Sequence, residues 1–172
     1  MSLAPGMEAP SFSLPDTDGV THSLGGGPAT LVVFTCNHCP YALAWHDRIA
    51  AVARDYPDVK VLAINPNDAE RYPRDSYDAM RERVATDGGW PMPYLRDESQ
   101  EVARAYGAKT TPDCFVIGAD GRIAYRGAPD ADYADRSQNA ALLRDALDAV
   151  LAGAEPAVPE TEPVGCSIKW KR

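Results

Sequence analysis

One short segment joins a predicted strand to a predicted helix: Ala29-Thr30-Leu31-Val32-Val33-Phe34-Thr35-Cys36-Asn37-His38-Cys39-Pro40-Tyr41. Residues 29–35 form a continuous, partly β-branched apolar run, which is typical of a strand covered on both faces of a sheet. Pro40 suits the first turn of a helix, because the N–H that it lacks would have no partner within the helix. Two cysteines therefore lie where a buried strand is expected to turn into a helix.

Cys36 and Cys39 are three residues apart and can close a small disulfide ring at the start of this helix. The first thiol would face the positive end of the helix dipole and free N–H groups, which favour its thiolate. His38 can add a positive charge, so we expect Asn37 and His38 to tune the pair. Because a stabilised thiolate stabilises the reduced form, we expect a potential above the thioredoxin value of about -270 mV, toward the isomerase value of about -180 mV.

The rest of the chain alternates predicted strands and helices, which is the pattern of an α/β domain. Two hairpins are expected, with turns at residues 16–19 and 119–121. We expect Ser76 and Ser99 to cap helices. The predicted strands cover residues 11–15, 20–24, 29–35, 59–65, 91–96, 114–117 and 122–126, and the predicted helices cover residues 40–56, 77–87, 100–106 and 140–151. One domain should span residues 1–153, followed by a Pro- and Glu-rich linker and a cysteine-bearing tail over residues 154–172.

Composition narrows the class of protein. The 172 residues are 45% hydrophobic and 24% charged, which fits one globular core. A formal net charge of -8 argues against nucleic-acid binding, which requires clustered Lys and Arg. Residues 1–6 lack the basic and apolar pattern of a signal peptide, and no segment approaches the ~20 apolar residues of a membrane span, so we expect a cytoplasmic protein without a membrane partner. Four cysteines are too few for a secreted scaffold of this size and favour redox or metal chemistry.

Several motifs together resemble a known superfamily. The Cys36–Pro40 motif, with Thr110-Thr111-Pro112 ahead of an apolar strand, resembles the thioredoxin superfamily, in which Pro112 would occupy the site of a cis-proline opposite the active-site disulfide. Over nearly the whole chain the closer resemblance is to a peroxiredoxin-like branch grouped with alkyl hydroperoxide reductase and thiol-specific antioxidant proteins. The segments that carry it are Phe34-Thr35-Cys36-Asn37-His38-Cys39-Pro40-Tyr41, Asn65-Pro66-Asn67-Asp68, Pro93-Tyr94-Leu95, Thr111-Pro112-Asp113 and Val164-Gly165-Cys166-Ser167-Ile168-Lys169-Trp170.

This resemblance implies a thioredoxin-like α/β fold, with a central mixed β-sheet flanked by helices, an N-terminal hairpin and a helical insertion. It also implies a thiol–disulfide oxidoreductase in which Cys36 attacks a partner disulfide and Cys39 resolves the mixed disulfide. Thr111 and Pro112 would present an extended edge to the partner. The expected partners are protein or small-molecule disulfides and a thiol electron donor. The redox-active disulfide would take the place of a bound cofactor, and no metal is expected.

The sequence departs from related patterns at positions that matter for the chemistry. Thioredoxins usually bury an acid where this chain has Thr30, and some relatives carry Glu where it has Ala42. A water or an acid from residues 65–75 must then move the proton of the resolving thiol. Peroxiredoxins have a Thr three residues and a Pro seven residues before their peroxidatic cysteine. At the same distances before Cys36 this chain has Val33 and Ala29. A thiol-dependent peroxidase and a non-catalytic redox-sensing or metal-binding module therefore stay as alternative functions.

The other two cysteines have separate interpretations. Cys114 on an apolar strand is expected to be a packing residue. Cys166 is either a mobile tail thiol or, if Ile168 and Trp170 anchor the tail, a third redox thiol near Cys36. A zinc site could be assembled from Cys36, His38 and Cys39 with Cys166 or His46, although structural zinc sites normally have a second close ligand pair. We expect His46 to be a packing residue, and residues 68–78 to form a solvated acidic face.

Overall fold

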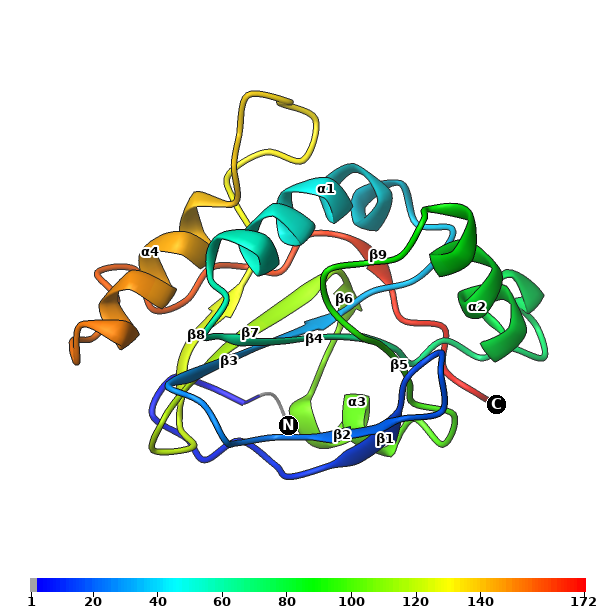
Figure 1. Cartoon of the computed structure of the whole chain (residues 1–172), viewed down its shortest axis with the longest axis horizontal. Helices are drawn as coiled ribbons and strands as arrows, with labels where there is room; N and C mark the ends of the chain where they lie inside the picture. Colours follow the sequence, from blue (N-terminus) through cyan, green and yellow to red (C-terminus); the bar gives the residue numbers. More distant parts are fainter. Residues whose placement is uncertain (1–2) are drawn as a thin grey trace.

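The computed structural model describes residues 3–172 and contains a five-stranded mixed sheet with helices on both faces (Figure 1). The strand order is β5-β4-β3-β7-β8, in which β3 is parallel to β4 and antiparallel to β7. This confirms the predicted central mixed sheet. The sheet strands are β3 (Ala29–Phe34), β4 (Lys60–Asn65), β5 (Tyr94–Arg96), β7 (Asp113–Gly118) and β8 (Ile123–Gly127), and the helices are α1 (Pro40–Asp55), η1 (Pro73–Asp75), α2 (Tyr77–Thr86), α3 (Glu101–Tyr106) and α4 (Ala141–Leu151).

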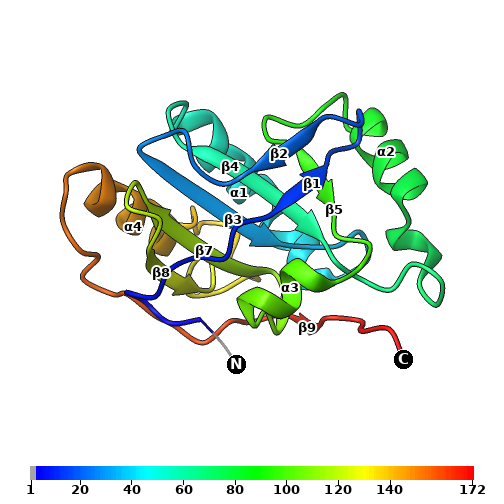
Figure 2. The ribbon, with the colours of Figure 1, turned by 90° about the horizontal axis from the view of Figure 1, so that it is seen from below.

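Alternation along β3 divides the interior into two cores. Leu31 and Val33 pack with buried side chains of α1 and α4, whereas Val32 and Phe34 pack with α3. Successive side chains of a strand point to opposite faces, so an unbroken apolar run is needed when both faces are covered. Figures 1 and 2 show α1 and α4 on one face, and α3 with the hairpin β1 (Ser13–Pro15) and β2 (Thr21–Ser23) on the other.

The two predicted helix caps have different outcomes. Ser76 is the N-cap of α2, and its side chain accepts a hydrogen bond from the Ala79 N–H at 3.1 Å, as predicted. The N-cap position of α3 is Gln100, one residue after the predicted Ser99. The Ser99 hydroxyl nevertheless accepts from the Glu101 N–H at 3.3 Å, and the Asp97 carboxylate accepts from the Ala103 N–H at 2.9 Å.

Two short strands were missed by the sequence patterns. β6 (Thr110–Thr111) pairs antiparallel with β9 (Cys166–Ser167), which lies almost at the end of the chain. The segment that leads to β9 runs beside β8, where the Arg126 N–H donates to the Pro159 carbonyl at 3.1 Å. Ile168 is only 3% exposed, and Trp170 lies against the Arg104 guanidinium. The tail is therefore docked on the domain.

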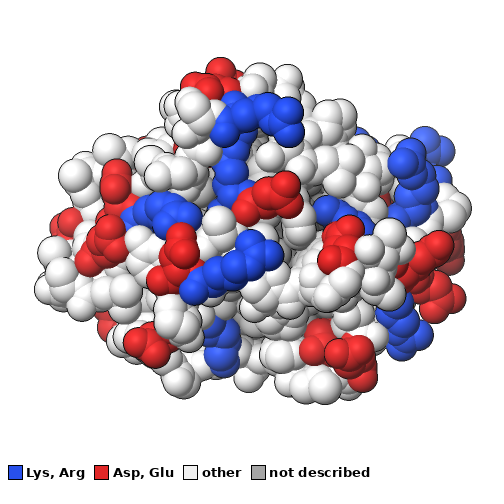
Figure 3. Space-filling view, turned by 45° about the horizontal axis from the view of Figure 1, so that its top comes forward, with Lys and Arg blue, Asp and Glu red and all other residues white. Residues whose placement is uncertain are grey.

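Charged side chains of both signs are interspersed on the face shown in Figure 3. Within residues 3–172, no helix combines the length and apolar character that crossing a membrane requires.

Candidate active site

The dithiol lies at the junction between β3 and α1. β3 ends at Phe34, and Cys39 is the N-cap residue of α1, with Pro40 in the first turn. All four cysteines are free thiols. Cys36 is 1% exposed and Cys39 is 0% exposed, so both thiols of the pair are shielded from solvent in this state.

Thr111 contacts both sulfurs from the opposite side of the site. The Thr111 hydroxyl lies 3.3 Å from the Cys36 Sγ, and the Cys39 Sγ donates to the Thr111 carbonyl at 3.0 Å. The Thr111–Pro112 peptide bond is cis, as the resemblance implied. The structure therefore brings Cys36, Cys39, Thr111 and Pro112 into one site.

The two neighbouring thiols shift each other's pKa. Their interaction is the main cause that lowers the pKa of Cys39 and raises the pKa of Cys36, and burial raises the Cys36 pKa further. Such a pair ionises as a unit, with one negative charge stabilised between the sulfurs. The expected stabilisation of the Cys36 thiolate is opposed first by the interaction with Cys39, then by burial and by the nearby Asp75 carboxylate, all of which raise its pKa.

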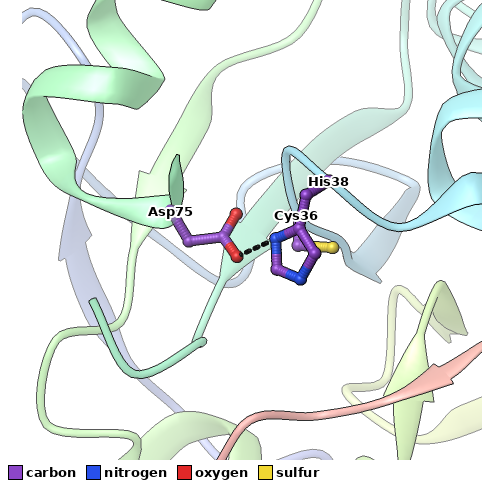
Figure 4. Close-up of side chains that lie close together, drawn as sticks. All are labelled: Cys36, His38 and Asp75. Atoms are coloured by element: carbon purple, nitrogen blue, oxygen red, sulfur yellow. Dashed lines mark ion pairs between the residues drawn. The ribbon is translucent and has the colours of Figure 1, made fainter. Parts of the chain in front are cut away.

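His38 faces a buried carboxylate. Its Nδ1 lies 2.6 Å from Asp75 Oδ2, and Asp75 itself is 0% exposed. Figure 4 shows the two side chains pointing toward each other, with Cys36 beside His38. The His38 ring also stacks on Tyr72, with ring centroids 5.7 Å apart. Asp75 thus fixes His38 at the dithiol.

The carboxylate is held by donors from several segments. Asp75 Oδ1 accepts from the Asn37 backbone N–H at 2.7 Å and from the Asn65 amide at 3.1 Å. Asp75 Oδ2 accepts from the Asn67 amide at 3.0 Å. A buried carboxylate requires such partners, because an unpaired buried charge is strongly destabilising. The prediction that residues 68–78 form only a solvated face was wrong, since Asp75 is in the interior.

Asn37 connects this network to the far side of the site. Its Oδ1 accepts from the Tyr94 hydroxyl at 2.7 Å and from Arg83 at 3.0 Å, and Arg83 also donates to the Cys36 carbonyl. Arg83 and Tyr94 were not predicted as site residues. The signal for Tyr94 was available, because it lies in one of the segments that carried the family resemblance.

Cys166 lies at the dithiol as well. It is opposite Thr111 in the β6–β9 pair and packs against the cluster of Cys36, Cys39 and Ala42. Burial and a hydrogen bond with Cys39 raise the pKa of Cys166 to about 11. Cys166 therefore lies in the cluster that contains Cys36, as the sequence had suggested, and Cys39 is the cysteine that affects its pKa.

The remaining candidates lie away from the chemistry. Cys114 is fully buried in the core, which agrees with a packing residue, and burial raises its pKa. His46 packs on Trp90 with ring centroids 4.4 Å apart, and burial lowers its pKa. The zinc ligand set that included His46 is therefore not assembled. Cys36, His38 and Asp75 do offer three ligand atoms within 4.8 Å of one another.

The chain is similar to several known proteins. A family model described as "AhpC/TSA family" matches residues 5–126. An uncharacterized conserved protein from Geobacillus kaustophilus is 38% identical with a TM-score of 0.92, covering 98% of this chain and 93% of that chain. A hypothetical protein from Sinorhizobium meliloti 1021 is 37% identical with a TM-score of 0.92, covering 99% and 97%.

A third solved structure supports the fold alone. A thioredoxin-like protein from Aeropyrum pernix is 19% identical with a TM-score of 0.58, covering 70% of this chain and 83% of that chain. No curated protein matches. With the family model matched over most of the domain and the predicted thioredoxin-like fold confirmed, the chain belongs to the AhpC/TSA family of thiol-based redox proteins.

Proposed function

We propose that this protein is a thiol–disulfide oxidoreductase that exchanges disulfides through Cys36 and Cys39. The observation that carries the proposal is the pair of buried thiols at the start of α1, whose sulfurs both contact Thr111 of the cis-peptide Thr111–Pro112. The substrate class is a protein or small-molecule disulfide, with a thiol as electron donor.

The exchange begins with the thiol pair in the state in which Cys36 and Cys39 together carry one proton and one negative charge. Cys36 attacks one sulfur of a partner disulfide, a bond forms between them, and the other partner sulfur leaves as a thiolate. For this step the shared proton moves from Cys36 to Cys39, which leaves Cys36 as the attacking thiolate. Cys39 then attacks the Cys36 sulfur, and the second partner sulfur leaves and takes up the proton of Cys39. The products are the Cys36–Cys39 disulfide, one thiol and one thiolate.

Polar neighbours on both sides support these roles. The Thr111 carbonyl accepts a hydrogen bond from the Cys39 Sγ, which keeps that thiol oriented. Asp75 places His38 beside Cys36, where an imidazolium would stabilise a departing thiolate. Asp75 is an acid from the segment at residues 65–75, and we propose that it acts by positioning His38.

A redox titration tests the proposal. The wild-type chain is equilibrated in glutathione buffers and quenched with acid, and the alkylated thiols are located by mass. We expect a Cys36–Cys39 disulfide with a potential above the thioredoxin value of about -270 mV. A peroxide-consumption assay separates the alternative, since a peroxidase would consume peroxide far faster than a free thiol does. Absence of any Cys36–Cys39 disulfide would refute the proposal.

A metal-binding function has one observation in its favour, the three ligand atoms of Cys36, His38 and Asp75. Metal analysis of anaerobically purified protein tests it. A stoichiometric metal that is released when Cys36 is replaced by Ser would support metal binding over disulfide exchange.

A further inference from the structure

The edge beside the cis-peptide is already occupied by the chain itself. In the proposed function this edge, Thr110–Thr111, would receive an extended partner. In the structure β9 pairs with it antiparallel, with Thr111 opposite Cys166 and Thr110 opposite Ser167 (Figure 1). The ladder continues where the Ile168 N–H donates to the Lys109 carbonyl at 3.1 Å. The C-terminal segment is therefore bound as an extended peptide would be.

The contact is close enough to restrict the residue before the cysteine. A Cβ at Gly165 would overlap the carbonyl of Thr111, which is backbone and cannot move aside easily. Glycine at this position lets the segment approach the cis-peptide. Anchors follow on the other side of Cys166, because Ile168 is buried and the Lys169 N–H donates to the Asn67 side chain at 2.9 Å. Cys166 is thus fixed from both sides.

Three thiols lie together in one cluster, in which Cys166 packs against Cys36 and Cys39. Thr111 contacts the Cys36 and Cys39 sulfurs and faces Cys166 across the β6–β9 pair, and the proximity of Cys39 contributes to the raised pKa of Cys166. Cys36 and Cys39 are buried, whereas Cys166 is partly exposed. The exposed thiol of the cluster is therefore the one on the tail.

We propose that the C-terminal segment is an internal substrate of the dithiol and that Cys166 is a third redox thiol, which exchanges with Cys39. The Cys166 sulfur attacks the Cys39 sulfur of the Cys36–Cys39 disulfide. The Cys39–Cys166 bond forms, the Cys36–Cys39 bond breaks, and Cys36 leaves as a thiolate that takes up the proton from Cys166. No external oxidant or reductant is consumed in this step. It moves the disulfide from the buried pair to the position where an external thiol can reduce it.

This inference rests on the proposed function, and three single substitutions in the full chain separate the two. Each variant is oxidised with glutathione disulfide, quenched with acid and mapped by mass. We expect Cys36→Ser to gain an intramolecular Cys39–Cys166 disulfide and to lose two hydrogens in mass. Cys166→Ser should form Cys36–Cys39. Cys39→Ser should form no intramolecular disulfide and should carry glutathione instead.

The disulfides found in these variants show separately whether the third-thiol proposal or the proposed function is wrong. If Cys36→Ser forms no Cys39–Cys166 bond while Cys166→Ser forms Cys36–Cys39, the third-thiol proposal is wrong and the proposed function stands. If Cys166→Ser forms no Cys36–Cys39 bond, the proposed function is wrong. A Cys36–Cys166 bond in Cys39→Ser, formed as readily as Cys39–Cys166 in Cys36→Ser, would overturn the central role of Cys39.

A second variant tests the strand pairing without removing a thiol. Gly165→Ala, combined with Cys36→Ser, should lose most of the Cys39–Cys166 disulfide, because the segment can no longer approach Thr111. Combined with Cys166→Ser, the same substitution should leave the yield of Cys36–Cys39 unchanged. Equal yields of Cys39–Cys166 with Gly165 and with Ala at this position would show that β9 does not present Cys166. Circular dichroism confirms that each variant is folded.

Discussion

Replacing Asp75 by Asn tests whether one buried carboxylate holds the site together. The side chain is 0% exposed, lies 2.6 Å from His38 Nδ1, and accepts hydrogen bonds from the Asn37 N–H and the Asn65 and Asn67 amides. An Asn side chain has nearly the same volume but only one acceptor oxygen. Its NH₂ group would face donors wherever it points, so at least one buried donor loses its partner.

The magnitude follows from these contacts. Leaving a buried hydrogen-bonding group without its partner costs about 1–3 kcal/mol. For a chain of this size about 1 kcal/mol shifts the melting temperature by roughly 2–4 °C, so Asp75→Asn should lower it by roughly 2–12 °C. The matched control is Asp78→Asn. That carboxylate is 94% exposed and lies 3.5 Å from Arg81, so its loss should cost less than about 0.5 kcal/mol.

A second readout separates a site role from a purely structural one. The Asp75 carboxylate is one of the groups that raise the pKa of Cys36, so its removal should lower the pH at which the thiol pair ionises. Thiolate absorbance in the ultraviolet, followed during a pH titration of Asp75→Asn and Asp78→Asn, measures this. If Asp75→Asn melts at the same temperature as Asp78→Asn, or if its thiols titrate as those of the wild type do, Asp75 does not support the dithiol site.

Three further predictions concern the other thiols and the tail. The pKa of Cys166 is about 11, so at pH 8 its thiolate fraction should be about 100-fold below that of an ordinary thiol with a pKa of 9. Iodoacetamide should therefore label Cys166 slowly in the folded protein and faster once urea unfolds the chain. Equal labelling rates in the folded and unfolded protein would contradict this. Gly165→Ala should speed that labelling in the folded protein, because β9 is displaced from Thr111, and an unchanged rate would be evidence against the close approach. Cys114→Ala should lower the free energy of unfolding by about 1–2 kcal/mol through the cavity that it leaves and should not alter the disulfides that form; an altered disulfide pattern would assign Cys114 a redox role.

The sheet could be predicted because its signals are local. The apolar run at β3 and the periodicity of α1 and α4 lie within single segments, and the structure places them at nearly the predicted bounds. β6 and β9 have two residues each and exist only through their mutual pairing, so no pattern within either segment could indicate them. The first turn of α3 shows the same limit. The Ser99 hydroxyl accepts from the Glu101 N–H, as the local pattern suggested, but the carboxylate that accepts from the Ala103 N–H belongs to Asp97, outside the pattern of a helix start.

The site shows the same division between local and long-range signals. The cysteines and the proline were found from spacing and resemblance, but the burial of Asp75 was not. In the sequence Asp75 lies in an acidic run, and only its partners at Asn37, Asn65 and Asn67 make burial tolerable. Two of these asparagines lie in a segment that carried the family resemblance. That segment therefore encodes the support of the buried carboxylate as well as part of the fold.

The dithiol is covered on two sides, one by a buried carboxylate and its hydrogen-bond donors and the other by the short strand β9. On one side the buried Asp75 carboxylate lies 2.6 Å from His38 and accepts hydrogen bonds from the Asn37 N–H and from the Asn65 and Asn67 amides, which join several segments of the interior. On the other side β9 adds a two-residue strand pair, and the residues after it are hydrogen-bonded at the surface of the domain to Asn67 and Gln100. Opening energies are lowest where few buried contacts are lost, so β9 is the side expected to open for a partner. Access to Cys36 would then be governed by release of the segment that carries Cys166, which links reactivity toward external disulfides to the redox state of the tail.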